Sequence, residues 1–200
     1  ATEHDEGAAA NAGRLRFHQR QHRLHRHSGI QSAAAIPQDA KPGFNGQRMT
    51  RRDHMALRGL RPIAEIMFGD FMALVADQLL NSASKFALMY QDNVTVPLVI
   101  RTPMGGGRGY GPTHSQCIEK MFLGIPGLKV VCPSLFHEPG ALLSNSILHH
   151  ATPVLFIEYK NLYSLTLQMP KTIRIASVGA DFPVAIADNS AHTPDIVIVC

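Results

Sequence analysis

The chain has 200 residues, 45% of them hydrophobic, and a formal net charge of +4. This composition can form one good hydrophobic core, and no apolar run approaches the length needed to span a membrane, so we expect no membrane insertion. The cysteines are odd in number and lie in apolar contexts, which favours reduced core thiols in a cytosolic or matrix-like compartment over a secreted disulfide framework. They are Cys117, Cys132 and Cys200.

Residues 1–56 are rich in Ala, Gln, His and Arg, and over half of the basic side chains lie at or before Arg58. Such a segment buries too little surface to offset its ordering entropy, so we predict a disordered leader. A targeting peptide or a nucleic-acid-binding arm is the alternative, which the acidic residues near the start and the lack of interleaved aromatic residues argue against. The histidines from His18 to His27 lack a nearby Cys or carboxylate that would complete a tetrahedral metal site.

From Arg61 onward, strand-like and helix-like patterns alternate. Strands are predicted over Pro62–Phe68, Val96–Ile100, Leu128–Cys132 and Thr152–Glu158. Helices are predicted after Asp70 as N-cap, with Leu74, Val75, Leu79, Ser82 and Phe86 inward, over Thr113–Ile125 and near Glu138–His149. This order predicts an α/β fold, a mostly parallel sheet with helices on both faces. Ligands of such sheets gather beyond the carboxyl ends of the strands.

The segment from Ile100 to Gln116 joins a predicted buried strand to a predicted helix through five glycines in seven positions. Such a loop allows close contacts that a Cβ forbids, at an entropic cost that suggests a ligand or another subunit. It matches neither the dinucleotide-binding G-x-G-x-x-G register nor a Walker motif. Thr113 and Gln116 have capping-box spacing, which predicts His114 in the first turn of a helix, where the dipole favours a neutral imidazole.

These residues, with the segments Gly59–Phe71 before them and Pro126–Ser134 after them, strongly resemble one family. It is the β subunit of the thiamine-diphosphate-dependent 2-oxo acid dehydrogenases, the decarboxylating component of the pyruvate and branched-chain complexes. The resemblance runs from about Leu57 to the C-terminus, with several motifs in the family's order and spacing. It implies a transketolase-like pyrimidine-binding domain over residues 57–165.

The resemblance also implies how the chain is divided. Residues 166–200 resemble a linker followed by the first strand, Asp195–Cys200, of the family's C-terminal domain. Residues 1–56 show no resemblance to the family. A domain that begins in the middle of a motif and stops after one strand of the next domain is expected to be a truncated, fused or frame-shifted fragment.

The resemblance further implies a shared active site. Thiamine diphosphate would lie between this chain and an α subunit, which holds the diphosphate and its magnesium, in an assembly with a second β subunit and a lipoyl-bearing acyltransferase core. Phe71 matches the aromatic residue that stacks on the aminopyrimidine, and the adjacent Gly69 and Asp70 are expected to bind the cofactor with it. His114 matches the histidine thought to hydrogen-bond intermediates and to assist acyl transfer to lipoyl. The implied reaction is oxidative decarboxylation of a 2-oxo acid, in the cytoplasm or, in a eukaryote, in the mitochondrial matrix.

A structural potassium ion is a further feature that the resemblance implies. The family binds this ion through backbone carbonyls at positions matching Leu98, Ile147, Leu148, His150 and Thr152. Carbonyl ligands carry over more readily than side chains, because every residue provides one. The family's frequent Asp is replaced here by His150, which removes a negative charge that would aid cation binding.

One departure from the family concerns catalysis. The family's activating glutamate closes a Pro-Ile-Ser-Glu motif, and the matching position in this chain is Asn45. An amide has no carboxylate to favour the charged pyrimidine from which the cofactor's reactive carbon is deprotonated. The strand residue Glu65 is no ready substitute, because the family already has a residue of that kind there. The alternative to an active subunit is therefore a catalytically inactive fragment or interaction module that keeps the fold.

Overall fold

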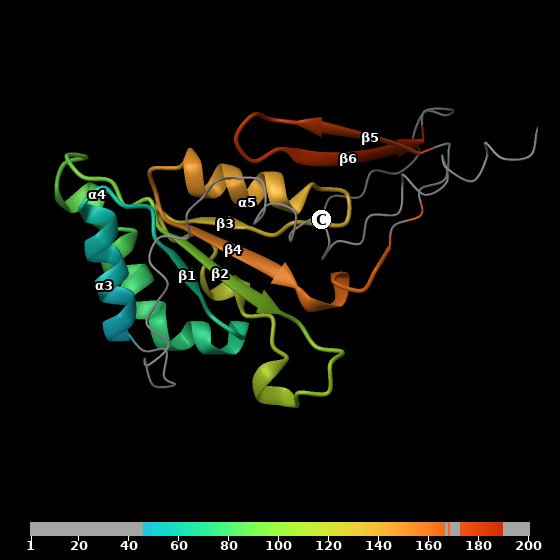
Figure 1. Cartoon of the computed structure of the whole chain (residues 1–200), viewed down its shortest axis with the longest axis horizontal. Helices are drawn as coiled ribbons and strands as arrows, with labels where there is room; N and C mark the ends of the chain where they lie inside the picture. The colour runs from blue at the N-terminus through green and yellow to red at the C-terminus, as the bar shows by residue number, and fades with distance from the viewer. Residues whose placement is uncertain (1–45, 167, 169–172, 190–200) are drawn as a thin grey trace, which may run out of the picture.

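The computed structural model of the chain describes residues 46–166, 168 and 173–189 (Figure 1). Asn45, the histidines from His18 to His27, Cys200 and the predicted strand Asp195–Cys200 lie outside these residues. No helix in the described part of the chain is long and apolar enough to cross a membrane.

Four parallel strands form the central sheet, in the order β1-β2-β4-β3. They are β1 (Ile63–Glu65), β2 (Val99–Met104), β3 (Lys129–Val131) and β4 (Val154–Tyr159). Each lies in or overlaps a predicted strand, and the central pair β2 and β4 runs in register from Val99 opposite Val154 to Met104 opposite Tyr159. Both central strands are largely buried, as expected for branched and aromatic side chains covered on two faces. The predicted parallel α/β fold is confirmed.

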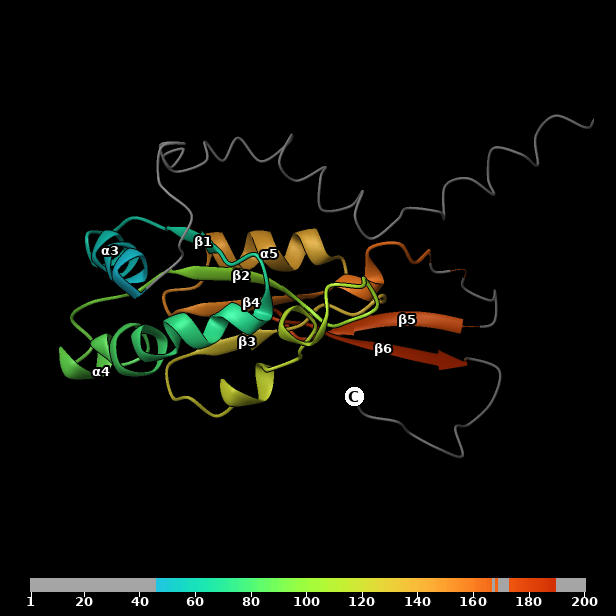
Figure 2. The ribbon, with the colours of Figure 1, turned by 90° about the horizontal axis from the view of Figure 1, so that it is seen from below.

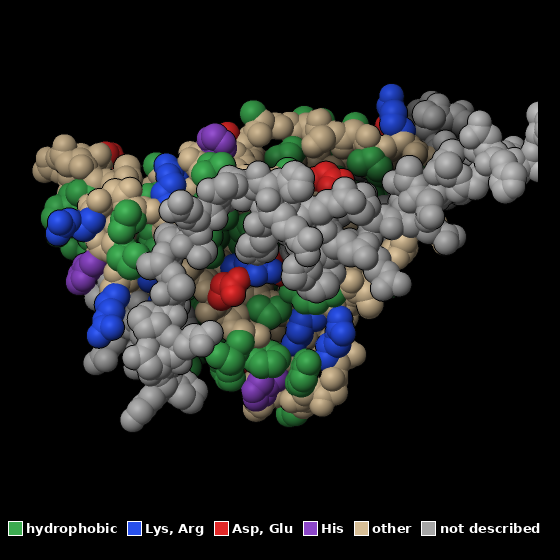
Figure 3. All heavy atoms as spheres, in the orientation of Figure 1, with side chains coloured by type: hydrophobic (Ala, Val, Ile, Leu, Met, Phe, Trp, Pro, Cys, Tyr) green, Lys and Arg blue, Asp and Glu red, His purple; other side chains and the backbone are tan. Residues whose placement is uncertain are grey.

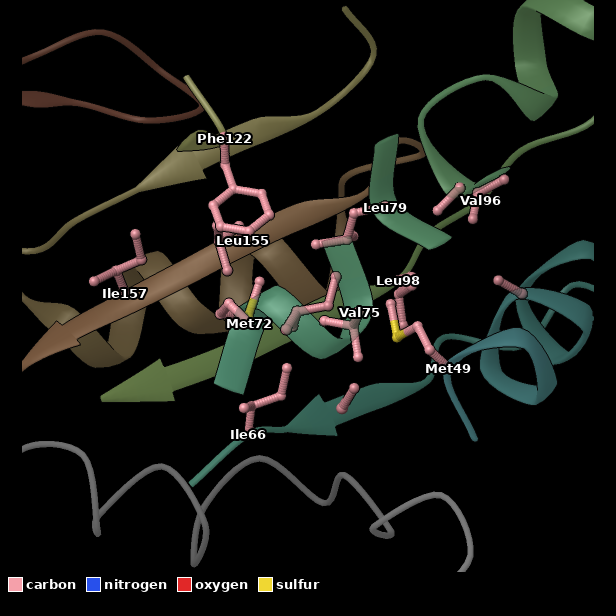
Figure 4. Close-up of a cluster of buried hydrophobic side chains, with 14 of the residues drawn as sticks. Met49, Ile66, Met72, Val75, Leu79, Val96, Leu98, Phe122, Leu155 and Ile157 are labelled. Carbon is pink, nitrogen blue, oxygen red and sulfur yellow. The ribbon is translucent and has the colours of Figure 1, made fainter. Parts of the chain in front are cut away.

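Helical elements cover both faces of this sheet (Figure 2). One face carries α3 (Gly46–Leu57), the 3-10 turn η1 (Gly69–Val75) and the π-helical η2 (Gln78–Ala83), and the other carries α5 (Pro139–Leu148). Figure 4 labels Leu155, Met72 and Leu79 in the core on the first face. Ile100 and Leu155 point to this face, where they pack with Met72 and Leu79. Their strand neighbours Val99 and Phe156 point to the second face, where they pack with Leu142 and Ile147. This alternation along each strand produces two cores from one sheet.

The helix α3 packs on the sheet, so the described fold extends upstream of the Leu57 boundary predicted from the sequence. Met49, Asp53 and Ala56 recur at helical spacing and are buried against the sheet and η2. The remaining positions of this helix are mostly polar, so its average composition gave no apolar signal. Residues 46–56 therefore belong to the domain and not to a disordered leader.

The helix predicted after Asp70 is divided into η1, η2 and α4 (Phe86–Met89). Phe68 occupies the N-cap position and makes no side-chain cap, while Asp70 lies inside the first turn. Val75 and Leu79 are buried as predicted, but Leu74 is exposed, because the three-residue period of the 3-10 turn η1 puts Met72 and Val75 on the sheet side.

The helix predicted over Thr113–Ile125 is wrong. The structure has only two 3-10 turns there, η3 (Pro112–His114) and η4 (Glu119–Met121). Thr113 Oγ1 lies 2.9 Å from Nδ1 of His114, and the Gln116 amide donates to Asp70, so the capping box does not form. The positive end of a helix dipole is consequently not available to His114.

The predicted helix near Glu138–His149 is confirmed as α5, with Glu138 at its N-cap position. The strands β5 (Ile173–Val178) and β6 (Val184–Asn189) form an antiparallel hairpin within the predicted linker. The Phe182 ring of this hairpin stacks on the ring of His150 at 4.2 Å. Two cysteines, Cys117 and Cys132, are free as predicted, but they are exposed and do not lie in the core.

Candidate functional site

Four aromatic rings gather at the carboxyl ends of β1 and β2. Phe68 lies at the centre of the group, with its ring centroid 4.7 Å from His114, 5.4 Å from Tyr110 and 5.9 Å from Phe71, each in edge-to-face contact. The rings of Phe71 and His114 also meet, at 5.2 Å. The structure thus brings together two residues that the resemblance assigned to one site, and it adds Phe68 and Tyr110, which the sequence analysis did not single out.

Gly69 and Asp70 connect η1 to the loop that carries His114. Gly69 is buried, and a Cβ at this position would overlap the side chain of Met104 at the end of β2. Asp70 Oδ1 accepts a hydrogen bond of 2.7 Å from Nε2 of Gln116, two residues after His114. These two residues therefore connect the start of η1 to the end of β2 and to the loop that carries His114.

A buried lysine closes the aromatic group from the end of β4. Lys160 begins the 3-10 turn η5 (Lys160–Leu162) and is 6% exposed. Its Nζ donates to the carbonyl oxygen of His114 at 2.8 Å and lies 4.9 Å and 5.4 Å from the ring centroids of Phe68 and Tyr110. The sequence analysis missed Lys160, although its position just beyond a buried parallel strand was the available signal.

A small cleft of about 190 Å³ lies at the carboxyl ends of β1, β2 and β4, where acidic and basic side chains meet near the centre of the face in Figure 3. Arg101 donates to buried Glu158 through Nε at 2.5 Å and Nη2 at 3.0 Å, and to exposed Glu65 through Nη1 at 2.5 Å. Tyr163 donates its hydroxyl to Glu158 at 2.6 Å. Burial alone would lower the pKa of Arg101, but Glu158 and then Glu65 more than offset this and raise it. The guanidinium is thus permanently charged, and it holds both carboxylates.

The carbonyls assigned to a potassium ion lie at the opposite, amino-terminal end of the strands. Leu98 directly precedes β2, Ile147 and Leu148 end α5, and His150 and Thr152 lie in the turn from α5 to β4. The Leu98 carbonyl accepts a hydrogen bond from the first residue of β4, which brings the start of β2 next to that turn. The structure therefore places these segments side by side.

Cationic side chains already occupy this neighbourhood. Nη1 of Arg61 donates to the carbonyl oxygens of Ile147 and His150, at 2.9 Å and 2.8 Å. Nζ of Lys129 lies 3.1 Å from Nδ1 of His150, and burial, followed by the Lys129 charge, lowers the pKa of this histidine. The residues present do not fit an added potassium ion, because Arg61 already binds two of the carbonyls and a second positive charge, Lys129, lies beside His150.

Known proteins resemble this chain over its central part. Residues 54–166 match the family described as transketolase, pyrimidine binding domain. The chain is 45% identical over 113 residues to the beta subunit of acetoin:2,6-dichlorophenolindophenol oxidoreductase from Cupriavidus necator, covering 56% of this chain and 33% of that protein. It is 34% identical over 147 residues to the beta subunit of 2-oxoisovalerate dehydrogenase from Bacillus subtilis, covering 72% and 42% of the two chains.

The pyruvate dehydrogenase E1 component subunit beta of Porphyra purpurea is 41% identical over 116 residues, which cover 58% of this chain and 35% of that protein. The chain thus spans only about a third to two fifths of the length of these relatives. These similarities confirm the resemblance to the β subunits that the motifs indicated. Because the matched residues 54–166 make up more than half of the chain, it belongs to the family of transketolase pyrimidine-binding domains.

Proposed function

We propose that this chain provides the pyrimidine-binding side of the active site in a β subunit of the 2-oxo acid dehydrogenase type. The reaction of the complete assembly is oxidative decarboxylation of a 2-oxo acid with acyl transfer to lipoyl, using thiamine diphosphate shared with an α subunit. The observation that carries this proposal is the contact of Phe71 with His114, whose rings lie 5.2 Å apart at the carboxyl edge of the sheet. Relatives that are beta subunits of such enzymes support it.

The aromatic group fits the planar pyrimidine ring of this cofactor. Phe71 and His114 are only half-buried, and Met67 and Tyr110 beside them are 60% and 54% exposed, so apolar surface is available to a ligand. Thiamine diphosphate, when bound, supplies the carbon nucleophile and the electron sink for decarboxylation. Phe71 would orient the pyrimidine by ring contact, at the place where parallel sheets bind their ligands.

His114 is the residue to which we assign hydrogen bonding with the reacting group. Its Nδ1 lies 2.9 Å from Thr113 Oγ1, which fixes the plane of the ring. Among the described residues no hydrogen bond involves Nε2, so this nitrogen is the one we assign to the substrate. The tautomer protonated at Nε2 can donate a hydrogen bond there, and the tautomer protonated at Nδ1 can accept a proton at Nε2, as general acid–base chemistry requires.

The partners follow from the surface around this site. Large apolar side chains are exposed on η1 and on the segment that contains η4: Leu74, Met121 and Leu123, at 57%, 62% and 58%. Such surface favours contact with other subunits, and we assign it to the α subunit and a second β subunit, with a lipoyl-bearing acyltransferase core as the acyl acceptor. We assign the diphosphate and its magnesium to the α subunit; the described residues contain no group of three or more His, Cys, Asp or Glu side chains that could hold a metal.

A catalytically inactive domain is the second candidate, and the state of the nearby carboxylates favours it. Asp70 accepts from Gln116, and Glu65 and Glu158 both accept from Arg101. Each of these acids is thus held by a partner within the chain. With Asn45 in place of the family's glutamate, the described residues offer no uncommitted carboxylate in this group to activate the pyrimidine.

A chimera tests both candidates. Residues 54–166 replace the matching segment in the Cupriavidus necator beta subunit, which keeps its own upstream motif, and acetoin-dependent dye reduction is measured with its α subunit. Phe71→Ala should weaken cofactor binding, and His114→Ala should lower turnover by roughly a hundred-fold or more with little change in cofactor binding. His149→Ala, at an exposed position after α5, is the matched control. An active chimera whose turnover is unaffected by both site variants contradicts the proposed roles.

A second chimera that carries residues 42–166 introduces Asn45 in place of the relative's own residue. If the second chimera loses turnover and the first does not, the inactive candidate is supported. Asn45→Glu in the second chimera should then restore turnover. If both chimeras are equally active, another acid reaches the pyrimidine and the second candidate is wrong.

A further inference from the structure

We propose that Lys160 is a positioning residue, which fixes the loop that carries His114 through its buried ammonium group. The inference rests on the proposed function, because that function gives the place of His114 its importance. Three contacts of Lys160 Nζ define it: a hydrogen bond of 2.8 Å to the carbonyl oxygen of His114, and the ring faces of Phe68 and Tyr110 at 4.9 Å and 5.4 Å. They connect the end of β4, the end of β1 and the glycine-rich loop of residues 105–114, called the glycine loop below.

The burial of this charge makes the contacts necessary. Lys160 is 6% exposed, and within the described residues no carboxylate forms an ion pair with it. A buried ammonium is costly unless polar or aromatic groups replace its water. The His114 carbonyl and the two rings are the groups that do so. A displacement of the loop would therefore leave the charge without its partners, so the ammonium holds His114 in place.

The other arm of the glycine loop is attached to the same turn. Nη2 of Arg108 donates to the carbonyl oxygen of Lys160 at 3.0 Å. Gly107 has a φ of +77°, and a Cβ there would lie 2.8 Å from Oδ1 of Asn161, so the loop passes tightly over the residue that follows Lys160. Both arms of the loop thus rest on η5. The side chain of Lys160 controls the arm with His114, and its backbone controls the arm with Arg108.

The test uses the full chain and compares Lys160→Met, which keeps the length of the side chain, with Lys160→Arg, which keeps the charge and its donors. The measured quantity is the rate at which diethyl pyrocarbonate modifies His114, resolved by peptide mass spectrometry. Exposed His54 and His149 serve as internal references, and Lys120→Met is the matched control at an exposed lysine. We expect faster modification of His114 in Lys160→Met, with the reference histidines unchanged, and recovery toward the native rate in Lys160→Arg.

An unchanged His114 rate in a folded Lys160→Met variant overturns the proposal, and so does a variant Lys160→Arg that behaves like Lys160→Met. If Lys160→Met does not fold, acetic anhydride labelling of the native chain decides: Lys160 should react far more slowly than Lys120, and Tyr110→Ala should accelerate it. Equal labelling of the two lysines, or no effect of Tyr110→Ala, overturns the proposal. These readouts need neither cofactor nor α subunit, so they stand apart from the chimera tests of function.

Discussion

Arg61 places Nη1 2.8 Å from the carbonyl oxygen of His150, so a guanidinium from the turn before β1 binds the turn between α5 and β4. The same nitrogen donates to the Ile147 carbonyl at 2.9 Å. These two carbonyls are among those at which the family resemblance implied a bound potassium ion. In this chain the guanidinium of Arg61 already binds both of them.

Arg61→Met should therefore lower the free energy of unfolding by about 1–3 kcal/mol, because two carbonyls lose a charged donor. The native chain should unfold at the same temperature in potassium chloride and in sodium chloride of equal ionic strength. The variant should be stabilised more by potassium than by sodium, since its carbonyls become available to an ion. Arg58→Met, at an exposed neighbouring position, is the control. A potassium-specific rise in the melting temperature of the native chain is the contrary result.

Asp53 should make the domain less stable as the pH rises. The side chain is 1% exposed, both carboxylate oxygens lack a hydrogen-bond partner among the described residues, and burial raises its pKa from 3.8 to about 7. The folded state therefore keeps a proton that the unfolded state has lost between these two values. Stability is highest at the acid end of this window and falls as the pH rises through it to about 7.

Asp53→Asn should remove this dependence and raise the free energy of unfolding at pH 8 by roughly 1–3 kcal/mol, since no charge is then buried. Denaturant titrations at pH 5 and pH 8 measure the effect. Asp92→Asn makes the same chemical change at an exposed position and should alter neither value by a comparable amount. If Asp53→Asn changes the free energy of unfolding by the same amount at pH 5 and at pH 8, the carboxylate has a partner in solution.

Glu158 and Glu65 both pair with Arg101, but they should differ strongly in their effect on stability. Glu158 is 1% exposed, whereas the Glu65 side chain is 65% exposed. Glu158→Gln leaves the guanidinium without its buried partner and should cost about 3–5 kcal/mol. Glu65→Gln should cost less than about 1 kcal/mol, because water screens that pair. Chemical denaturation of the two variants tests the difference, and equal losses would contradict the assigned geometry.

Gly107→Ala should destabilise the glycine loop more than Gly109→Ala. Both residues have positive φ, at +77° and +75°, so both substitutions carry the same backbone strain. Only at Gly107 would the new Cβ also meet Asn161, while nothing lies within 4 Å at Gly109. Hydrogen exchange over residues 105–114 should therefore increase more in Gly107→Ala. Asn161→Ala in the Gly107→Ala background should reverse the excess, and a lack of reversal would assign the effect to backbone strain alone.

The sequence by itself determined the sheet and the edge at which the site lies. The predicted strands Val96–Ile100 and Thr152–Glu158 are local signals, because a strand buried on both faces needs a mainly apolar run wherever its neighbours lie. The order of strands and helices then fixed a parallel sheet, and the ends of its strands placed Phe71 and His114 at one edge. Their ring contact agrees with this expectation.

Only the tertiary structure decided the elements whose ends depend on distant partners. Gln116 bonds Asp70, 46 residues away, and does not close a capping box, so the expected helix around His114 is absent. The burial of α3 depends on Met49 and Ala56 meeting the sheet, which average composition does not show. The Lys160 ammonium binds the carbonyl of His114, also 46 residues away, and this contact is what makes Lys160 part of the site. A local sequence pattern specifies a strand, whereas the contacts of a loop or a helix end depend on residues that are distant in the sequence and close in the fold.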